Sequence, residues 1–344
     1  MKTLVVTGGA GFFGGILKRQ ILERGDRCIS IDICPDEDEH PNLRKLQMDL
    51  RDAAAVKHVL ASEPVDAVIH CAALLAHGTI KREDLFASNV EGTRNLAVAM
   101  RACNIRHMVF TSTNCLWGEA FNRPVREDDA PKPIELYGQS KWEAEKVIRE
   151  YPDLISVIIR CPTIIDFGRL GLLAILFEFI HEGRRVWTVG GGRNRYQFIY
   201  AGDLARACLM AAEYGQSDTF NIGSDDVKSL AEIYQHVITV AKSKSKVSAL
   251  PLGPTLAAMK LAYHLHISPL GPYHYKMIAE DFLFDTSRIK SRLGWTPTLT
   301  NEQMLLRAYQ YYAENRHDIE SRQNVSAHRR NAKMGVIRLL KWVS

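Results

Sequence analysis

The sequence lacks the features that mark several common protein classes. Its seven cysteines are scattered and form no C-x-x-C pair, which indicates neither a disulfide framework nor a zinc site, and no other metal site is expected. No apolar run reaches the roughly 18 residues of a membrane-spanning helix. The basic residues form no recognisable nucleic-acid recognition element, and the net charge of +5 is modest. Free cysteines, and a strand-like run that begins at residue 3 with no signal peptide before it, favour the cytoplasm.

Short β-branched runs alternate with helix-like segments through the first two-thirds of the 344 residues. The apolar runs cover 3–7, 27–32, 65–70, 106–113 and 154–162, and the helical patterns between them include 16–25, 89–104 and 139–151. Such apolar strands, separated by helices, are typical of a parallel sheet covered on both faces. The sequence therefore predicts the α/β fold class, with a doubly wound parallel sheet.

After residue 165 the alternation weakens. Residues 169–186 look like a helix that leaves the sheet, whereas 198–215 and 219–223 look like a strand, a helix and a strand that return to it. The rest is mostly helical, with a loop expected over 266–277. We expect a nucleotide-binding domain formed by 1–165 and 198–223, and a smaller, mostly helical substrate lobe formed by 166–197 and 224–315.

Residues 316–344 form a basic and then amphipathic tail. Its apolar side chains lie within 336–343, after the basic run at 329–333. Such a segment could lie weakly on an anionic membrane surface, or it could pack on its own protein.

A glycine-rich stretch, TGGAGFFGG, follows the first apolar run directly and leads into a helical pattern. Gly8, Gly11 and Gly14 fit a dinucleotide-binding turn, and a second register starts at Gly9. Glycines at these places allow a tight turn, a close approach of a pyrophosphate and close packing of helix on strand. The N–H groups at the helix start favour phosphate binding.

Asp32 ends the second apolar run, 21 residues after Gly11. A carboxylate there can accept hydrogen bonds from both ribose hydroxyls of an adenosine, and it would repel a 2′-phosphate. The acidic residues that follow, ICPDEDEH, also favour NAD over NADP as the cofactor. The alternative is that Asp32 only caps the end of a strand.

Tyr137 and Lys141 lie four residues apart in LYGQSKWEAEK and so share one face of a predicted helix. The spacing alone is common and fits an ordinary helix surface equally well.

Taken with these features, further motifs resemble the extended short-chain dehydrogenase/reductase family, and within it the NAD-dependent sugar epimerase/dehydratase branch. The motifs are MDLRD (48–52), HCAA (70–73), NVEGTRNL (89–96), FTSTNCLWG (110–118), YGQSK (137–141), RCPTII (160–165), FIYAGDLA (198–205), FNIG (220–223) and LGWTP (293–297). The likeness covers roughly residues 1–312, and it implies a Rossmann domain.

The resemblance implies a role for each matching residue. Tyr137 would be the acid/base, Lys141 would bind the nicotinamide ribose and lower the pKa of Tyr137, and Thr113 would bind the reacting oxygen. The residues implied in NAD binding are Gly8, Gly11, Phe12, Phe13, Gly14, Asp32, Asp49, Leu50, Ala72, Ala73, Asn89, Tyr137 and Lys141. The family also implies a homodimer formed through the helix that holds Tyr137.

Two departures from the family pattern bear on the substrate. Family members that act as 4,6-dehydratases have an Asp-Glu pair after the Thr, whereas this chain has Asn114 and Cys115, which argues against that reaction. Cys115 would line the pocket or pack. The family's phosphate-binding Arg is replaced by Tyr196, one position after Arg195, as in 3β-hydroxysteroid-dehydrogenase-like relatives. Either Arg195 reaches a phosphate, or the substrate has none.

Three functions remain open for a small-molecule substrate. The first is NAD-dependent epimerisation of a nucleotide sugar through a keto intermediate. The second is NAD-dependent oxidation or reduction of a hydroxysteroid-like or other lipid-like alcohol, which the apolar stretch 256–270 would suit. The third is a non-catalytic NAD-binding protein, which the presence of Thr113, Tyr137 and Lys141 disfavours.

Overall fold

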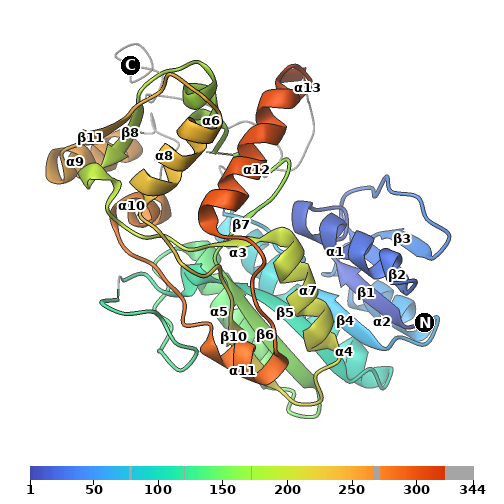
Figure 1. Ribbon diagram of the computed structural model, residues 1–344. Coiled ribbons are helices and arrows are strands. Elements are labelled where there is room, and N and C mark those ends of the chain that lie inside the picture. Colours follow the sequence, from blue (N-terminus) through green and yellow to red (C-terminus); the bar gives the residue numbers. More distant parts are fainter. Residues whose placement is uncertain (77–79, 120, 172, 266–271, 322–344) are drawn as a thin grey trace.

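A seven-stranded parallel sheet forms the centre of the larger part of the molecule (Figure 1). The computed structural model describes residues 1–321, except 77–79, 120, 172 and 266–271. The strand order is β10-β6-β5-β4-β1-β2-β3, and every neighbouring pair is parallel. The strands are β1 (Thr3–Thr7), β2 (Arg27–Asp32), β3 (Leu43–Gln47), β4 (Ala67–His70), β5 (His107–Thr113), β6 (Ile155–Cys161) and β10 (Asp218–Asn221). The order reverses between β1 and β4, which is where sheets of this kind bind ligands, beyond the carboxyl ends of their strands.

Helices cover both faces of this sheet, as Figure 1 shows. One face packs against α1 (Phe12–Glu23), α7 (Ala201–Ala212) and α11 (Ser287–Leu293). The other face packs against α2 (Ala53–Ala61), α4 (Gly92–Ala102) and α5 (Leu136–Arg149). The central strands β1, β4, β5 and β6 are mostly apolar because both of their sides are buried. The predicted doubly wound α/β fold is therefore confirmed.

A second group of elements lies above the carboxyl ends of the strands in Figure 1. It contains α6 (Leu173–His181), α8 (Leu230–Val240), α9 (Leu252–His264), α10 (Pro272–Ala279), α12 (Asn301–Glu314) and α13 (Arg316–Ser321). Two small parallel sheets pair β8 (Val186–Val189) with β11 (Val247–Leu250), and β7 (Thr163–Ile165) with β9 (Phe198–Tyr200). A cluster of buried apolar side chains from α6, α8 and α12 forms its core. The exact domain boundaries expected from the sequence remain a proposal.

Three expectations need correction or qualification. The segment at 198–200 does not return to the main sheet, because β9 pairs with β7, and only β10 joins β6. Part of the loop expected over 266–277 is helical, because α10 begins at Pro272, and proline at the first position of a helix costs no hydrogen bond. Residues 266–271 and the amphipathic part of the tail lie outside the described residues.

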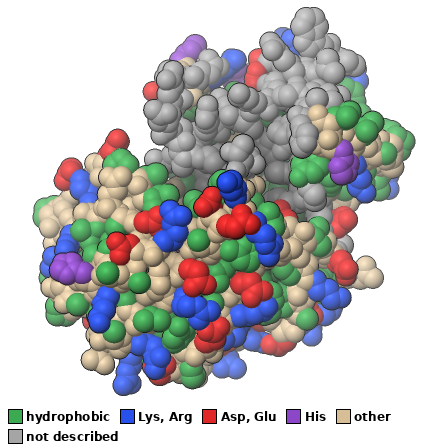
Figure 2. Space-filling view, turned by 180° about the vertical axis from the view of Figure 1, so that it is seen from behind, with side chains coloured by type: hydrophobic (Ala, Val, Ile, Leu, Met, Phe, Trp, Pro, Cys, Tyr) green, Lys and Arg blue, Asp and Glu red, His purple; other side chains and the backbone are tan. Residues whose placement is uncertain are grey.

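Two findings concern only the described part of the chain. None of its helices is long and apolar enough to cross a membrane, and it contains no group of three or more His, Cys, Asp or Glu residues that could hold a metal. On the face shown in Figure 2, Lys and Arg side chains lie among Asp and Glu side chains over the sheet domain. The described residues on that face therefore form no field of one charge sign.

Candidate active site

The glycine turn between β1 and α1 fits a dinucleotide pyrophosphate. Gly8 has a φ of +74°, and its N–H donates to the carbonyl of Ile31 at 2.7 Å. An ideal Cβ on Gly14 would lie 2.0 Å from the Gly8 carbonyl oxygen, so only glycine allows the helix to approach the turn this closely. Helix α1 begins at Phe12, followed by Phe13, with Gly11 as its N-cap, no side-chain cap and no acidic residue in its first turn. The helix start is thus suited to an anion.

Asp32 is held against the glycine turn. Its Oδ2 accepts from the Ala10 N–H at 3.0 Å, and its Oδ1 accepts from the Cys34 N–H at 2.9 Å. The carboxylate thus lies beside the turn where the ribose of a dinucleotide would bind. Besides closing its own loop, the carboxylate holds the turn.

The segments that follow β3 and β4 also reach this edge of the sheet. The Asp49 carboxylate binds the Arg51 guanidinium at 2.6 and 2.9 Å, and this hydrogen bond lowers the pKa of Asp49. Leu50 is buried beside it. The N–H of Ala72, which precedes Ala73, donates to Thr7 Oγ1 at 3.2 Å.

Asn89 ties one of these segments to helix α5. It lies in a π-helix over Ala87–Glu91, a feature that often marks functional sites. Its Oδ1 accepts from the Leu74 N–H at 2.7 Å, and its Nδ2 donates to the Leu74 carbonyl at 2.9 Å and to Ser140 Oγ at 3.0 Å. Ser140 Oγ in turn donates to the Tyr137 carbonyl at 2.8 Å. Asn89 therefore fixes the start of α5 relative to the loop after β4.

Thr113 and the start of α5 meet through a close backbone contact. Strand β5 ends at Thr113, whose Oγ1 accepts from the Cys115 N–H at 3.1 Å. An ideal Cβ on Gly138 would lie 2.2 Å from the Cys115 carbonyl oxygen, so glycine lets α5 pack directly on this segment. Tyr137, the residue before Gly138, is half-buried at the helix start. The structure thus brings together the ends of two elements that the sequence separates by more than twenty residues.

Lys141 lies one helical turn after Tyr137 and is buried. Its Nζ lies 3.9 Å from the centroid of the Phe110 ring. Burial lowers the pKa of Lys141 to about 8. Burial and the charge of Lys141 lower the pKa of the neighbouring His70 to about 3, so this imidazole is neutral. Lys141 is therefore a cation in an apolar environment, which favours a nearby anion such as a phenolate.

Two buried polar groups near the site were not assigned a role from the sequence. His70 Nδ1 lies 2.7 Å from Thr7 Oγ1, and its Nε2 lies 2.8 Å from Thr93 Oγ1, which donates to the Asn89 carbonyl at 2.7 Å. The position of His70 at the end of an apolar run, in HCAA, could have marked it as a candidate site residue. Its hydrogen-bond partners, however, lie in other segments and could not be read from the sequence. The second group is Glu145, which lies one turn beyond Lys141.

Glu145 forms a buried ion pair with Arg160 of β6. Arg160 Nε and Nη2 donate to its two carboxylate oxygens at 3.0 and 2.8 Å. Ser112 Oγ, next to Thr113 in β5, also donates to Glu145 at 2.6 Å. Burial raises the pKa of Glu145, but the hydrogen bonds and charge of Arg160 outweigh it, and the net pKa is lowered. The ion pair locks α5 onto β5 and β6.

Two residues that the sequence predicts to bind substrate, Asn114 and Arg195, already form a hydrogen bond and an ion pair with other residues of the protein. Asn114 Nδ2 donates to the Tyr196 hydroxyl at 2.6 Å, and both residues are buried. Arg195 forms a two-pronged ion pair with Asp281 at 3.0 and 3.1 Å and is exposed. Burial, and then the Glu135 carboxylate, raise the pKa of Cys115 well above its ordinary value, so its thiol is neutral. A phosphate would have to compete with Asp281 for Arg195.

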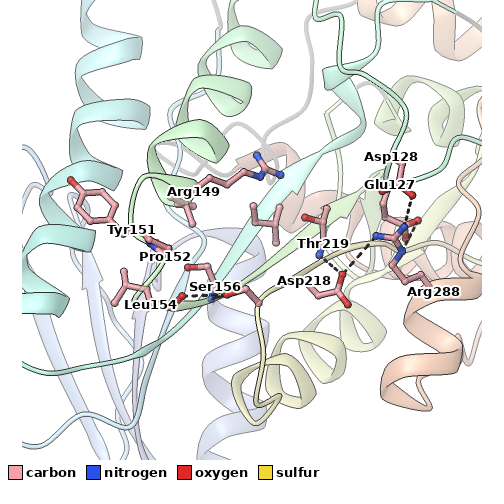
Figure 3. A pocket seen from close by; sticks show the side chains of 13 residues that line it. Glu127, Asp128, Arg149, Tyr151, Pro152, Leu154, Ser156, Asp218, Thr219 and Arg288 are labelled. Carbon is pink, nitrogen blue, oxygen red and sulfur yellow. Dashed lines mark hydrogen bonds and ion pairs between the residues drawn. The ribbon is translucent and has the colours of Figure 1, made fainter.

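A groove of about 520 Å³ lies at the opposite end of the strands, between α5, β6, β10 and α11 (Figure 3). Arg288 crosses it and contacts Asp128 at 2.6 Å, Glu127 at 3.6 Å and Asp218 at 3.8 Å. These charges satisfy one another. Because the glycine turn lies at the carboxyl ends of the strands, this groove is separate from the site described above.

Known proteins resemble the chain over most of its length. A family model described as the NAD dependent epimerase/dehydratase family matches residues 4–223. Uncharacterized protein y4nG of Sinorhizobium fredii is 35% identical over 99% of this chain and 86% of its own length. The UDP-glucose 4-epimerase of Lactobacillus helveticus is 25% identical over 88% of this chain and 93% of its own.

A solved structure shares the fold. The enzyme WbmH of Bordetella bronchiseptica in complex with NAD+ has a TM-score of 0.75 and 24% identity, and covers 91% of this chain and 99% of its own. At this identity the likeness concerns the fold alone. The resemblance deduced from the sequence motifs is confirmed by the family match.

Proposed function

This chain belongs to the NAD dependent epimerase/dehydratase family, whose cofactor is NAD, and on that premise we propose that it is an NAD-dependent epimerase of a nucleotide sugar. The observation that carries the proposal is the packing of Gly138 on the Cys115 carbonyl, which holds the start of α5, where Tyr137 lies, against the segment that follows Thr113. In the proposed site a base, a cation and a hydroxyl from two elements act on one carbinol carbon, as hydride transfer requires.

Each of these side chains has a separate task in the proposed reaction. Tyr137 removes the proton from a substrate hydroxyl and later returns it. Lys141 stabilises the phenolate, and because Lys141 is buried its charge is poorly screened and acts strongly. Thr113 holds the reacting oxygen by a hydrogen bond. NAD, held by the glycine turn and Asp32, would supply a reversible hydride acceptor at the substrate carbon, and return of the hydride to the opposite face would invert that carbon.

Elimination of water is disfavoured in this site. A 4,6-dehydratase needs an additional acid and base beside Thr113. Asn114 does not titrate, and it bonds the Tyr196 hydroxyl. The Cys115 thiol has a raised pKa and does not supply a base at neutral pH. We therefore favour epimerisation over dehydration.

The test is conversion of sugar nucleotides without added cofactor. We expect NAD to stay bound through gel filtration, and NMR to detect an epimer formed from a UDP-, GDP- or dTDP-hexose. Tyr137→Phe should lose about 10²-fold or more of the turnover while it keeps NAD, since only the proton path is removed. Tyr151→Phe, just beyond the end of the same helix, is the matched control and should stay active. Full turnover by Tyr137→Phe would show that another residue is the acid/base.

A second candidate is favoured by the bonds of Asn114 and Arg195. Asn114 already bonds Tyr196, and Asp281 already pairs with Arg195, so the position at which the sequence predicts a phosphate contact is occupied by an ion pair. An NAD-dependent dehydrogenase or ketoreductase of a lipid-like alcohol needs none. NADH released from a hydroxysteroid, with no binding of UDP, GDP or dTDP in saturation-transfer NMR, would favour this candidate over the epimerase.

We also propose that the protein is a homodimer formed through α5 and the adjacent α4. Val98 on α4 is an apolar side chain that is 50% exposed, which supports a contact at this face. Sedimentation velocity should give the mass of a dimer, and Val98→Asp should shift it toward the monomer.

A further inference from the structure

A buried lysine on α1 lies outside the catalytic residues and has no role in the proposed reaction. The side chain of Lys18 is 1% exposed. Gly14, Lys18 and Ile21 are spaced four and three residues apart, so they share the face of α1 that packs on the sheet. An ammonium in such a place is costly unless carboxylates pair with it.

The partners of Lys18 come from the loop after β2. Its Nζ donates to Asp36 Oδ1 at 2.5 Å and Oδ2 at 2.6 Å, and it lies 2.8 Å from Asp38 Oδ2. Ser30 Oγ of β2 donates to Asp36 Oδ2 at 2.5 Å. Burial raises the pKa of Asp36, but the hydrogen bonds from Lys18 and Ser30 outweigh it, so the carboxyl is ionised.

The cluster of Lys18, Asp36 and Asp38 adjoins the glycine turn. An ideal Cβ on Gly9 would lie 2.1 Å from Ser30 Oγ, so Ser30 packs directly against the turn. Two residues further along β2, the Asp32 carboxylate accepts the Ala10 N–H and so holds the same turn. The cluster therefore lies next to the position proposed above for the adenosine ribose.

The acidic loop thus has a different electrostatic role from the one expected. From the sequence, the acidic residues of this loop as a group favoured NAD over NADP. In the structure, Asp36 and Asp38 share the charge of Lys18, and Glu39 pairs with Lys45. One ammonium faces two carboxylates, so the cluster is negative only as long as both are ionised.

We propose that Lys18, Asp36 and Asp38 form a second determinant of cofactor specificity, which adds to Asp32 in selecting NAD over NADP. The inference rests on the proposed placement of the adenosine ribose at Asp32. The two carboxylates cancel the attraction of Lys18 for a 2′-phosphate and add one negative charge. Without them, the ammonium favours the phosphate of NADP.

The test compares variants that change the charge in opposite directions. Calorimetric titration of NAD and NADP at pH 8, into protein from which bound NAD has been removed, gives the ratio of the two dissociation constants, Kd(NADP)/Kd(NAD). Asp36→Asn with Asp38→Asn should lower this ratio at least about tenfold, because it removes two negative charges and turns the cluster from net negative to net positive at an effective dielectric constant of about 20. Lys18→Met should raise it. A purely structural role would loosen the loop in both variants and move the ratio in the same direction, which would overturn the proposal.

Two further variants test whether a change in this ratio comes from the charge of the cluster. Asp38 is 50% exposed, so Asp38→Asn alone should fold, and it should lower the ratio by a smaller factor. Glu39→Gln removes an 84% exposed carboxylate of the same loop and should leave the ratio unchanged. An unchanged ratio in Asp38→Asn and in the double variant would refute the second determinant. Failure of the unmodified protein to bind either cofactor would instead refute the placement of the ribose.

Discussion

At the scale of single residues, the site depends on an ammonium kept in an apolar environment. Lys141 lies against the Phe110 ring, and its burial disfavours its charged form. A cation that is poorly solvated interacts strongly with a new anion, which is what a base beside it needs. The folded protein therefore tolerates a local instability at the place where the reaction would occur.

Replacement of this lysine should stabilise the protein without cofactor. The pKa of Lys141 is lowered from 10.5 to about 8, so at pH 7 the burial of its charge costs up to ~3 kcal/mol. Between pH 8 and pH 10.5 the unfolded state binds more protons, and stability rises with pH. Urea unfolding of Lys141→Met should thus show its greatest advantage over the parent below pH 8, and almost none near pH 10.5.

Lys146→Met on the same helix is the matched control. Its side chain is 48% exposed and pairs with Glu143, so the change should be small and nearly independent of pH. An advantage of Lys141→Met that stayed constant with pH would mean that packing, and not charge, determines the difference.

The site residues that could be predicted from the sequence are those whose motif lies within a few neighbouring residues. The spacing of Tyr137 and Lys141 and the glycines of the first turn can be read along the chain. Lys18 could have been found as a cation on the buried face of an amphipathic helix, but its partner Asp36 lies on another segment. His70 likewise takes its meaning from Thr7 and Thr93, which only the sheet brings to it.

At the scale of elements, helix α5 is the part that must be held in place. Its start packs on the Cys115 carbonyl, and its middle is locked to β5 and β6 by the ion pair of Glu145 and Arg160. Ser112 of β5 also donates to Glu145. The Glu145 carboxylate therefore holds the end of β5, with Thr113, in a fixed position relative to α5, which contains Lys141.

Glu145→Gln should therefore lower both stability and turnover. It leaves the Arg160 guanidinium buried with a weaker partner, which costs about 3 kcal/mol in the free energy of unfolding. Urea denaturation and the rate with saturating substrate measure the two effects. Glu143→Gln, an exposed carboxylate on the same helix, should change the free energy of unfolding by less than about 1 kcal/mol. Full turnover by Glu145→Gln would show that the ion pair only stabilises the fold.

Strands that are strongly apolar could be predicted from the sequence, whereas strands with a weak hydrophobic pattern could not. The runs that became β1, β2, β4, β5 and β6 are buried on both faces and were identified. Strand β3, LRKLQ, is a half-buried edge strand with three polar residues, and its pattern gives no such signal. The partner of β9 could not be deduced either, because strand pairing depends on how the whole chain folds back.

At the scale of the whole molecule, the residues proposed to bind the cofactor come from segments far apart in the sequence. The glycine turn, Asp32, Asn89 and Lys141 come from different elements that converge at the carboxyl edge of one sheet. A ligand that contacts all of them binds only the folded chain, so its binding energy adds to the stability of the whole molecule.

NAD should therefore raise the melting temperature, and the choice of cofactor should be visible in the shift. At a concentration about 100 times Kd, the stabilisation is about 2.7 kcal/mol, which corresponds to a rise of roughly 5 °C for a protein of this size. NADP at the same concentration should give a smaller rise, because the Asp32 carboxylate repels its 2′-phosphate. Asp32→Ala should lose much of the NAD shift and bring the two cofactors closer together. Equal shifts by NAD and NADP in the unmodified protein would contradict the role of Asp32, since a carboxylate beside the ribose has to distinguish a hydroxyl from a phosphate.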